Sequence, residues 1–408
     1  MKYVIVLADG MADYPVPALN GNTPLQVSRK PNMNFIASHG QVGMVKTVPS
    51  GMPPGSDVAN LSVMGYDPRA YYTGRSPLEA VSIGIKLGAD DIAFRCNLVT
   101  LSEEPAQYEQ KTMVDYSSDE ISTEEASVLI NDLATRLNSE QINFYPGISY
   151  RHLMVWRKGP ISTKLTPPHD ISDRPITPWL PAGDGQDTLL DLMKKSQAIL
   201  NDHPINRERE KKGLRPANSI WLWGQGKKPS IPSFFSKYGL NGSVISAVDL
   251  AKGLGICAGM QVINVPGATG NVHTNFKGKA EAALSAIRGG QDFIYLHVEA
   301  PDEAGHRGEI ENKILSIERI DADILEPLLR ELPSITDCFK LMVLPDHPTP
   351  LTLKTHVSDP VPFAIYQSDQ PVSGLTQPFD ELSAAGTGLM IENGYQLMDQ
   401  FINNSSGR

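Results

Sequence analysis

Residues 292–306 read DFIYLHVEAPDEAGH, in which a short apolar run is followed by acidic residues and a histidine. The run from Phe293 to Val298 is typical of a buried strand, since it is rich in aromatic and branched side chains. The acidic cluster then follows the carboxyl end of that strand. Open α/β sheets bind their ligands at this edge, so we expect a functional site here.

Similar apolar runs recur along the chain and alternate with segments of helical pattern. They are YVIVLADG, QVGMVKTV, GSVISAV, QVINV, KLMVLPDH and PFAIYQS. This alternation predicts an α/β fold with buried, mostly parallel strands. Two further strands end in polar residues: Asp9 ends the first, and Asp346 with His347 follows the strand Leu341–Leu344. We expect the three polar clusters to converge on one crevice.

The length of 408 residues suits two domains. Between about residues 85 and 240 the sequence contains charged, helix-like segments and a stretch rich in proline and tryptophan. Strand-like runs resume after it. We therefore expect residues 1–84 and 241–408 to form one α/β domain, and residues 85–240 to form a smaller domain inserted into it.

Composition excludes several classes of function. The formal charge is −10, with 46 acidic and 36 basic residues and no run of lysine or arginine, so nucleic acid is not an expected partner. The three cysteines lie far apart, which argues against a disulfide framework or a thiolate zinc site. There is no run of eighteen apolar residues, so we expect no signal peptide or membrane span. The prediction is a cytoplasmic protein that acts on a small polar molecule.

Asp302 and His306 are four residues apart, which places both side chains on one face of a helical turn, where they are able to bind one metal ion. By itself this pair is more typical of a helix-start aspartate and a surface histidine than of a metal site. Asp346 and His347 are adjacent, and neighbours in a regular strand point to opposite sides, so this pair predicts two neighbouring ions.

Asp9 and His356 complete a set of three aspartates and three histidines. Mixed oxygen and imidazole ligands favour Mn²⁺ or Zn²⁺ over Mg²⁺ or Ca²⁺. Two-metal sites of this kind carry out phosphoryl transfer.

Ser56 lies in the segment PPGSD, which predicts a tight turn before the helical segment DVANLSVM. A serine hydroxyl is a weak nucleophile unless a base or a metal ion activates it. The amino end of a helix also favours a bound phosphate. The alternative is that Ser56 only caps the helix, but the nearby metal cluster favours a nucleophile.

Several motifs resemble those of the cofactor-independent phosphoglycerate mutases, in particular the archaeal-type branch, within the alkaline phosphatase superfamily. They are LADGMAD, GMPPGSDVANLSVMGYDPRAYYTGRSPLEA, FRCNLVT, YRHLMVW, DEAGH, LPDH and THVSDPVPF. The resemblance extends over essentially the whole chain. It implies an alkaline-phosphatase-like three-layer αβα domain with a mostly parallel sheet and an inserted smaller α+β domain.

The resemblance also implies an activity. Ser56 would take phosphate from 3-phosphoglycerate, the enclosed glycerate would reorient, and its 2-hydroxyl would take the phosphate back, without 2,3-bisphosphoglycerate. Two divalent ions would be needed. The favoured identities are Mn²⁺ and Zn²⁺, and Co²⁺ is an alternative. The implied ligands of one ion are Asp9, Ser56, Asp346 and His347, and those of the other are Asp302, His306 and His356.

Further site residues are implied by the resemblance alone. Asp173 and Arg174 would be catalytic residues of the inserted domain, with an aspartate moving a proton between hydroxyls. The substrate-binding residues would be Asp57, Arg151, His152, Asp170 and Lys252. Those of the inserted domain fit surface salt bridges equally well. Asn60 stands where the bacterial branch has a histidine, and its role is open.

Three other functions fit the same residues. A homoserine kinase-like phosphotransferase would use a nucleotide donor, although neither a P-loop nor a kinase glycine-rich loop is present. A metal-dependent phosphatase would use the same ions and serine. A non-enzymatic metal-binding scaffold is the third, and the PPGSD segment argues against it. Coupled assays with 3-phosphoglycerate, with homoserine and ATP, and with an aryl phosphate distinguish these functions.

Overall fold

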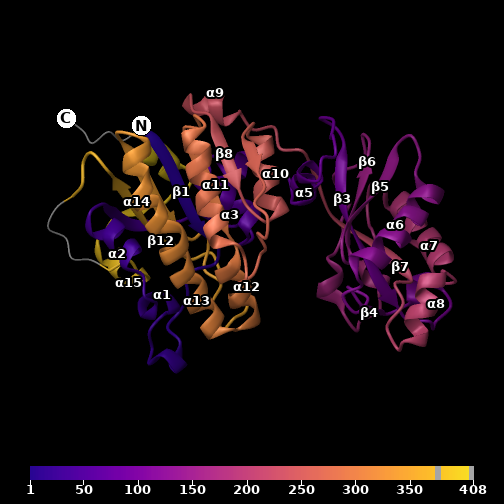
Figure 1. Ribbon diagram of the computed structural model, residues 1–408. Coiled ribbons are helices and arrows are strands. Elements are labelled where there is room, and N and C mark those ends of the chain that lie inside the picture. The colour runs from indigo at the N-terminus through magenta and orange to yellow at the C-terminus, as the bar shows by residue number, and fades with distance from the viewer. Residues whose placement is uncertain (373–377, 404–408) are drawn as a thin grey trace. The chain divides into compact units, whose positions relative to one another are not determined.

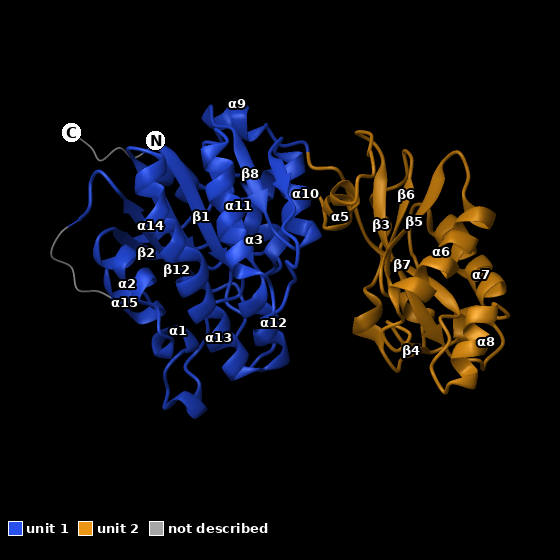
Figure 2. Cartoon of the chain, viewed as in Figure 1, with its two compact units in different colours: residues 1–72, 230–408 blue, residues 73–229 orange. Residues whose placement is uncertain are grey.

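The computed structural model describes residues 1–372 and 378–403, and its chain forms two compact units (Figures 1 and 2). Unit 1 consists of residues 1–72 and 230–408, and unit 2 of residues 73–229. Unit 2 is thus inserted into the sequence of unit 1.

The unit boundaries lie about a dozen residues before the expected positions at 85 and 240. Helix α5 (Ser76–Ser82) packs against strands of unit 2, and so joins that unit. At the other boundary, the Phe234 ring lies 4.4 Å from the Phe293 ring in the core of unit 1. Both segments are assigned by packing partners that lie far away in the sequence.

Unit 1 contains an eight-stranded, mostly parallel sheet in the order β13-β2-β12-β11-β1-β10-β8-β9. Its strands are β1 (Lys2–Ala8), β2 (Gln41–Val45), β8 (Gly242–Ile245), β9 (Gln261–Ile263), β10 (Phe293–Val298), β11 (Phe339–Leu344), β12 (Val361–Gln367) and β13 (Met390–Ile391). Only β12 runs antiparallel to its neighbours, β11 and β2. This confirms the predicted α/β fold with a mostly parallel sheet.

Helices cover both faces of this sheet. One face carries α2 (Pro31–Ser38), α11 (Phe276–Arg288), α13 (Ile310–Ile320), α14 (Glu326–Ile335) and α15 (Glu381–Gly386). The other carries α3 (Ser56–Val63), α10 (Asp249–Cys257) and α16 (Gln396–Asn403). The remaining elements are α1 (Pro24–Val27), α4 (Pro68–Tyr71), α9 (Phe234–Tyr238), α12 (Ala300–Arg307), a 3₁₀ helix (Pro17–Leu19) and a π-helix (Asp321–Leu325). Figure 1 shows α11, α13 and α14 lying in front of the sheet.

Alternation along β1 explains this three-layer packing. Val4, Val6 and Ala8 belong to the core beneath α11 and α13. Tyr3 points to the opposite face, where its ring packs edge-on against Phe401 of α16 at 5.6 Å. Successive strand residues point to opposite faces, so a strand buried on both sides reads as a continuous apolar run.

Unit 2 is an α+β unit with an antiparallel sheet. Its strands are β3 (Ile92–Leu101), β4 (Met113–Asp115), β5 (Ile142–Ile148), β6 (Arg151–Trp156) and β7 (Ser219–Lys227), and its longer helices are α6 (Thr123–Leu137), α7 (Gln186–Leu200) and α8 (Pro204–Lys211). Apolar residues of α6 and α7 share one core with the sheet, and Figure 1 shows both helices on the same side of it. Among the described residues, no helix is both long and apolar enough to cross a bilayer.

Candidate active site

The three polar clusters predicted from the sequence follow three adjacent strands of unit 1. Asp9 comes directly after β1, Asp346 and His347 follow β11, and Asp302 and His306 lie on α12, which begins just after β10. Strands β10 and β11 are the parallel neighbours of β1, so their carboxyl ends meet at one edge of the sheet. The sequence correctly predicted this convergence.

Asp9, Asp346 and His347 form the first group of side chains. The His347 Nε2 atom lies 3.5 Å from Asp9 Oδ1 and 3.5 Å from Asp346 Oδ2, and all three side chains are at most 2% exposed. Ser56 Oγ lies 3.1 Å from His347 Nε2 and 3.5 Å from Asp9 Oδ2. The predicted nucleophile therefore lies against this group.

Asp302, His306 and His356 form the second group. Asp302 Oδ2 lies 3.3 Å from His306 Nε2, and Asp302 Oδ1 lies 3.4 Å from His356 Nε2. The two imidazole Nε2 atoms are 2.8 Å apart. His306 Nδ1 lies 3.0 Å from the backbone oxygen of Lys354, a contact in which this nitrogen donates and leaves Nε2 free as a ligand. Ligand atoms of Asp302, His347 and His356 also lie within 4.8 Å of one another, so His347 borders both groups.

The prediction that Asp346 and His347 point to opposite sides of a strand is wrong. Strand β11 ends at Leu344, so neither residue lies in regular strand geometry. Both side chains reach the same group of ligand atoms. The support for two ions therefore comes from the two groups of ligand residues. It does not come from the orientation of Asp346 relative to His347.

Burial and close charges shift the pKa values of the site. Burial, followed by repulsion from Asp346 and Asp302, raises the pKa of Asp9 well above its usual value. Burial also raises the pKa of Asp302, but hydrogen bonds from His306 and His356 outweigh it and hold this pKa well below the usual range. The same hydrogen bond, which His306 donates to Asp302, raises the pKa of His306 to about 9.

The residues present fit divalent cations. Asp9 Oδ1 is buried and has no hydrogen-bond partner among the described residues. A buried polar atom without a partner is unfavourable, and a cation near His347 Nε2 would satisfy it. The carboxylates of Asp9 and Asp346 also repel each other, which a cation between them would relieve. Three carboxylates and three imidazoles match the ligand preferences of Mn²⁺ and Zn²⁺.

Ser56 does not cap the helix that it begins. It is the first residue of α3, and the N-cap position is taken by Gly55, which has no side chain to bind the free N–H groups. Its hydroxyl is instead directed to His347 and Asp9. This excludes the capping interpretation and leaves the hydroxyl adjacent to the first group.

Gly10 is required by the close approach of the three strand ends. Its φ is +61°, and a Cβ atom at this position would lie 2.6 Å from Asp302 Oδ1 and from Thr349 Oγ1. The Gly10 N–H also donates to Asp346 Oδ1 at 3.2 Å. Only glycine combines this backbone conformation with the absent side chain.

Four side chains that the sequence did not assign to the site surround its ligands. His297 Nε2 lies 2.9 Å from Asp9 Oδ2, and Thr349 donates from Oγ1 to Asp302 Oδ1. Asn60 Nδ2 donates to Asp346 Oδ2 at 2.9 Å, and the Tyr295 hydroxyl donates to Asn60 Oδ1 at 2.6 Å. The sequence contained signals for three of them. The apolar run FIYLHV includes a histidine and a tyrosine, and a buried helix includes an asparagine.

Asp57 adjoins Ser56 in the sequence, whereas Lys252 is connected with α3 only through the packing of its helix. Asp57 is in the first turn of α3, and its Oδ2 accepts a hydrogen bond from the Tyr72 hydroxyl at 2.7 Å. Lys252 is a partly buried residue of α10, a helix that packs against α3.

Within unit 2, Arg151 and His152 differ in exposure. Arg151 begins β6 and is exposed, with its guanidinium 5.4 Å from the centre of the Tyr150 ring. His152 is 2% exposed, its Nδ1 accepts from the Gly147 N–H at 2.9 Å, and burial lowers its pKa to about 3. His152 is therefore almost completely buried within unit 2.

Asp170, Asp173 and Arg174 expose their side chains in unit 2. Asp173 adopts a φ of +60°, and its N–H donates to the Met113 oxygen at 2.8 Å. The Arg174 oxygen accepts from the Met113 N–H at 3.1 Å. Backbone pairing with β4 thus fixes this turn while both side chains stay exposed.

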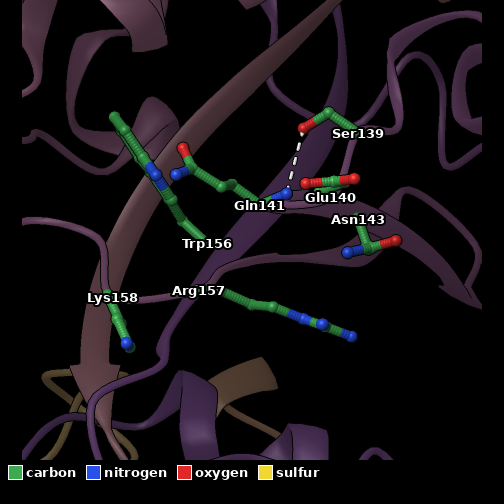
Figure 3. Close-up of a pocket in the computed structure, with 7 residues that line it drawn as sticks. All are labelled: Ser139, Glu140, Gln141, Asn143, Trp156, Arg157 and Lys158. Carbon is green, nitrogen blue, oxygen red and sulfur yellow. Dashed lines mark hydrogen bonds between the residues drawn. The ribbon is translucent and has the colours of Figure 1, made fainter.

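A surface pocket of about 600 Å³ lies elsewhere in unit 2 (Figure 3). It is lined by Ser139, Glu140, Gln141, Asn143, Trp156, Arg157 and Lys158. None of these belongs to the predicted site. The candidate active site is instead a compact, largely buried cluster of polar side chains in unit 1.

Comparisons with known proteins give the family. A family model described as 2,3-bisphosphoglycerate-independent phosphoglycerate mutase matches residues 37–206. The enzyme of that name from Methanothrix thermoacetophila is 51% identical over 398 residues, covering 98% of each chain. A solved protein of Pyrococcus horikoshii has a TM-score of 0.81 at 28% identity, over 100% of this chain and 98% of that one. The cofactor-independent phosphoglycerate mutase of Thermoplasma acidophilum has a TM-score of 0.67 at 27% identity, with both chains fully covered. The chain therefore belongs to the family of 2,3-bisphosphoglycerate-independent phosphoglycerate mutases.

Proposed function

We propose that this protein interconverts 3-phosphoglycerate and 2-phosphoglycerate through a phosphoserine at Ser56. The observation that carries the proposal is the position of Ser56 Oγ, 3.1 Å from His347 Nε2 and 3.5 Å from Asp9 Oδ2. A hydroxyl at the start of α3 and beside a metal-ligand group is suited to attack a phosphate.

Two divalent cations, Mn²⁺ or Zn²⁺, would complete this site. Asp9, Asp346, His347 and Ser56 would hold one, and Asp302, His306 and His356 the other, with His347 on the border between them. When bound, the cations would neutralise phosphate charge and favour the ionised form of the serine hydroxyl.

In the first transfer, Ser56 Oγ attacks the phosphorus of 3-phosphoglycerate. The Oγ–P bond forms as the serine hydroxyl loses its proton, the bond from phosphorus to the substrate O3 breaks, and O3 takes up a proton. The glycerate then reorients, and its O2 attacks the phosphoserine. The P–Oγ bond breaks, the O2 hydroxyl loses its proton, and Ser56 regains one, so the overall reaction is an isomerisation.

Other residues would bind the substrate and move the proton. We propose that Arg151 and Arg174 bind the carboxylate or phosphate, since arginine forms paired hydrogen bonds with both. Asp173 would carry the proton between the two hydroxyls, and Asp57, Asp170 and Lys252 would make further contacts. The burial of His152 does not support a substrate contact, so it is not included.

The direct test is to supply 3-phosphoglycerate to the metal-loaded protein and to measure 2-phosphoglycerate with enolase. Quenched samples should contain phosphate esterified to Ser56, detected by peptide mass spectrometry. Parallel assays with homoserine and ATP, and with an aryl phosphate, test the two alternative phosphotransfer functions. Formation of phosphohomoserine at a higher kcat/KM than 2-phosphoglycerate would overturn the proposal.

A further inference from the structure

His297 is a buried histidine that the proposed reaction does not use directly. It lies on β10 and is 1% exposed. Its Nε2 atom is 2.9 Å from Asp9 Oδ2, and its Nδ1 atom is 3.1 Å from Ser246 Oγ. Both ring nitrogens therefore have a partner, one of which is a proposed metal ligand.

The neighbouring hydrogen bonds determine which ring nitrogen carries the proton. The Val248 N–H donates to Ser246 Oγ at 2.9 Å, which leaves the hydroxyl proton for another acceptor. His297 Nδ1 lies closer to that hydroxyl, at 3.1 Å, than the Val248 oxygen does, at 3.5 Å. If Ser246 donates to Nδ1, the ring proton is on Nε2 and points to Asp9.

This arrangement distinguishes the two oxygens of Asp9. Oδ2 accepts from His297 and lies beside Ser56, whereas Oδ1 has no hydrogen-bond partner among the described residues and lies 3.5 Å from His347 Nε2. The imidazole thus fixes the rotation of the carboxylate. It leaves one defined oxygen for a cation.

We propose that His297 is a positioning residue for the first metal ion, because it holds Asp9 with Oδ1 directed to the ion. The inference rests on the two-metal site of the proposed function. Hydrogen-bonded partners of metal ligands typically contribute 10- to 100-fold in metal affinity. Asp302, in the second group, is oriented by Thr349 and not by His297, so the effect should be selective for one ion.

The test is to titrate the metal-free full-length protein with Mn²⁺ and to measure free Mn²⁺ by electron paramagnetic resonance. His297→Leu keeps a similar volume without a donor, and should weaken one of two binding sites about 10- to 100-fold while the other changes less than about twofold. His297→Gln places an amide N–H near the position of Nε2, and should recover most of the lost affinity. Ser246→Ala should weaken the same site by a smaller factor.

Ser243→Ala provides a matched control. Ser243 is buried on the neighbouring strand β8, and its hydroxyl has no hydrogen-bond partner among the described residues. Its removal should leave both affinities unchanged, and the thermal midpoints of the metal-free variants should show that each is folded. If His297→Leu does not fold, the Mn²⁺ affinities of Ser246→Ala and Ser243→Ala still test the role of His297, because only the first of these changes affects its hydrogen bonds.

Unchanged Mn²⁺ affinity in His297→Leu, or in Ser246→Ala where the first variant fails to fold, would overturn the inference. Equal weakening of both sites would also overturn it, because a general structural defect is not selective. Because the titration contains no substrate, its result is independent of the mutase assay. Two Mn²⁺ sites without mutase activity would refute the proposed reaction and leave the role of His297 intact.

Discussion

Ser56 Oγ lies 3.1 Å from His347 Nε2, although 291 positions separate the two residues in the sequence. The contact joins the amino end of α3 to the loop after β11. It places a hydroxyl beside a group of metal-ligand side chains.

Ser56→Ala should abolish mutase turnover while the metal-free protein keeps its thermal midpoint. The substitution removes the nucleophile but only one of several metal ligands, so at least one Mn²⁺ should remain bound. Turnover should fall more than about 100-fold, which corresponds to a barrier increase above about 2.7 kcal/mol. Coupled enolase kinetics and metal analysis of the same sample check both parts. Activity above one hundredth of the wild-type value would contradict the phosphoserine mechanism.

Metal binding by the second group should tighten with pH up to about 9. The hydrogen bond to Asp302 raises the pKa of His306 to about 9, so a proton competes with the metal at neutral pH. Between pH 7 and 8 the Mn²⁺ affinity of this site should increase about tenfold, and binding at pH 7.5 should release a proton. A histidine with an ordinary pKa of about 6.5 would give almost no change in this range.

The stability of the metal-free protein should depend on pH in the opposite sense. Because the folded pKa of His306 is raised, its pairing with Asp302 stabilises the fold fully below about pH 6.5. This contribution is lost as the pH rises through about 9. The thermal midpoint of chelator-treated protein should fall over this window, and the fall should be smaller in His306→Gln. An equal fall in both proteins would show that other groups are responsible.

Asn60→Ala should reduce both stability and turnover. Asn60 is fully buried and joins Ser56, Asp346 and Tyr295 by hydrogen bonds, so its removal leaves buried polar atoms without partners. The free energy of unfolding should decrease by about 1–3 kcal/mol in urea denaturation. Tyr295→Phe removes only the outer hydrogen bond and should have a smaller effect on turnover. If both variants behave alike, Asn60 does not link the helix to Asp346.

Lys313→Met should strongly destabilise unit 1, although Lys313 is not itself a proposed metal ligand. Lys313 Nζ lies 2.7 Å from Asp13 Oδ2, and both side chains are fully buried. Removing one partner of a buried pair leaves an uncompensated charge, so we expect a loss of about 3–5 kcal/mol in chemical denaturation. Arg330→Met, which breaks an exposed pair with Glu326 of α14, is the control and should change the free energy of unfolding far less.

Arg174→Ala and Asp173→Asn test the proposed roles of unit 2. If these exposed side chains bind glycerate and move its proton, mutase turnover should fall about 100-fold. The ratio of inorganic phosphate to isomer should rise, because water would then reach the phosphoserine more often. Measuring 2-phosphoglycerate and phosphate in one reaction checks this. Unchanged rates and an unchanged ratio would assign both residues to the surface alone.

Local sequence determined the fold class and most of the predicted site. An apolar run such as Phe293–Val298, rich in branched and aromatic side chains, favours a buried strand, and acidic residues directly after such a strand lie at the sheet edge. The same reasoning applies to Asp9, and the turn before α3 indicated Ser56 as a nucleophile once the neighbouring metal-ligand motifs were taken into account. These features depend on a few neighbouring residues.

Only the tertiary structure decided the features that depend on distances between segments remote in the sequence. Packing of α5 and Phe234 set the unit boundaries, and the end of β11 at Leu344 let Asp346 and His347 reach the same group. The raised pKa of His306 and the hydrogen bond from His297 to Asp9 arise from side chains on different elements. Electrostatic and hydrogen-bond energies depend steeply on such separations, which no local pattern of residues encodes.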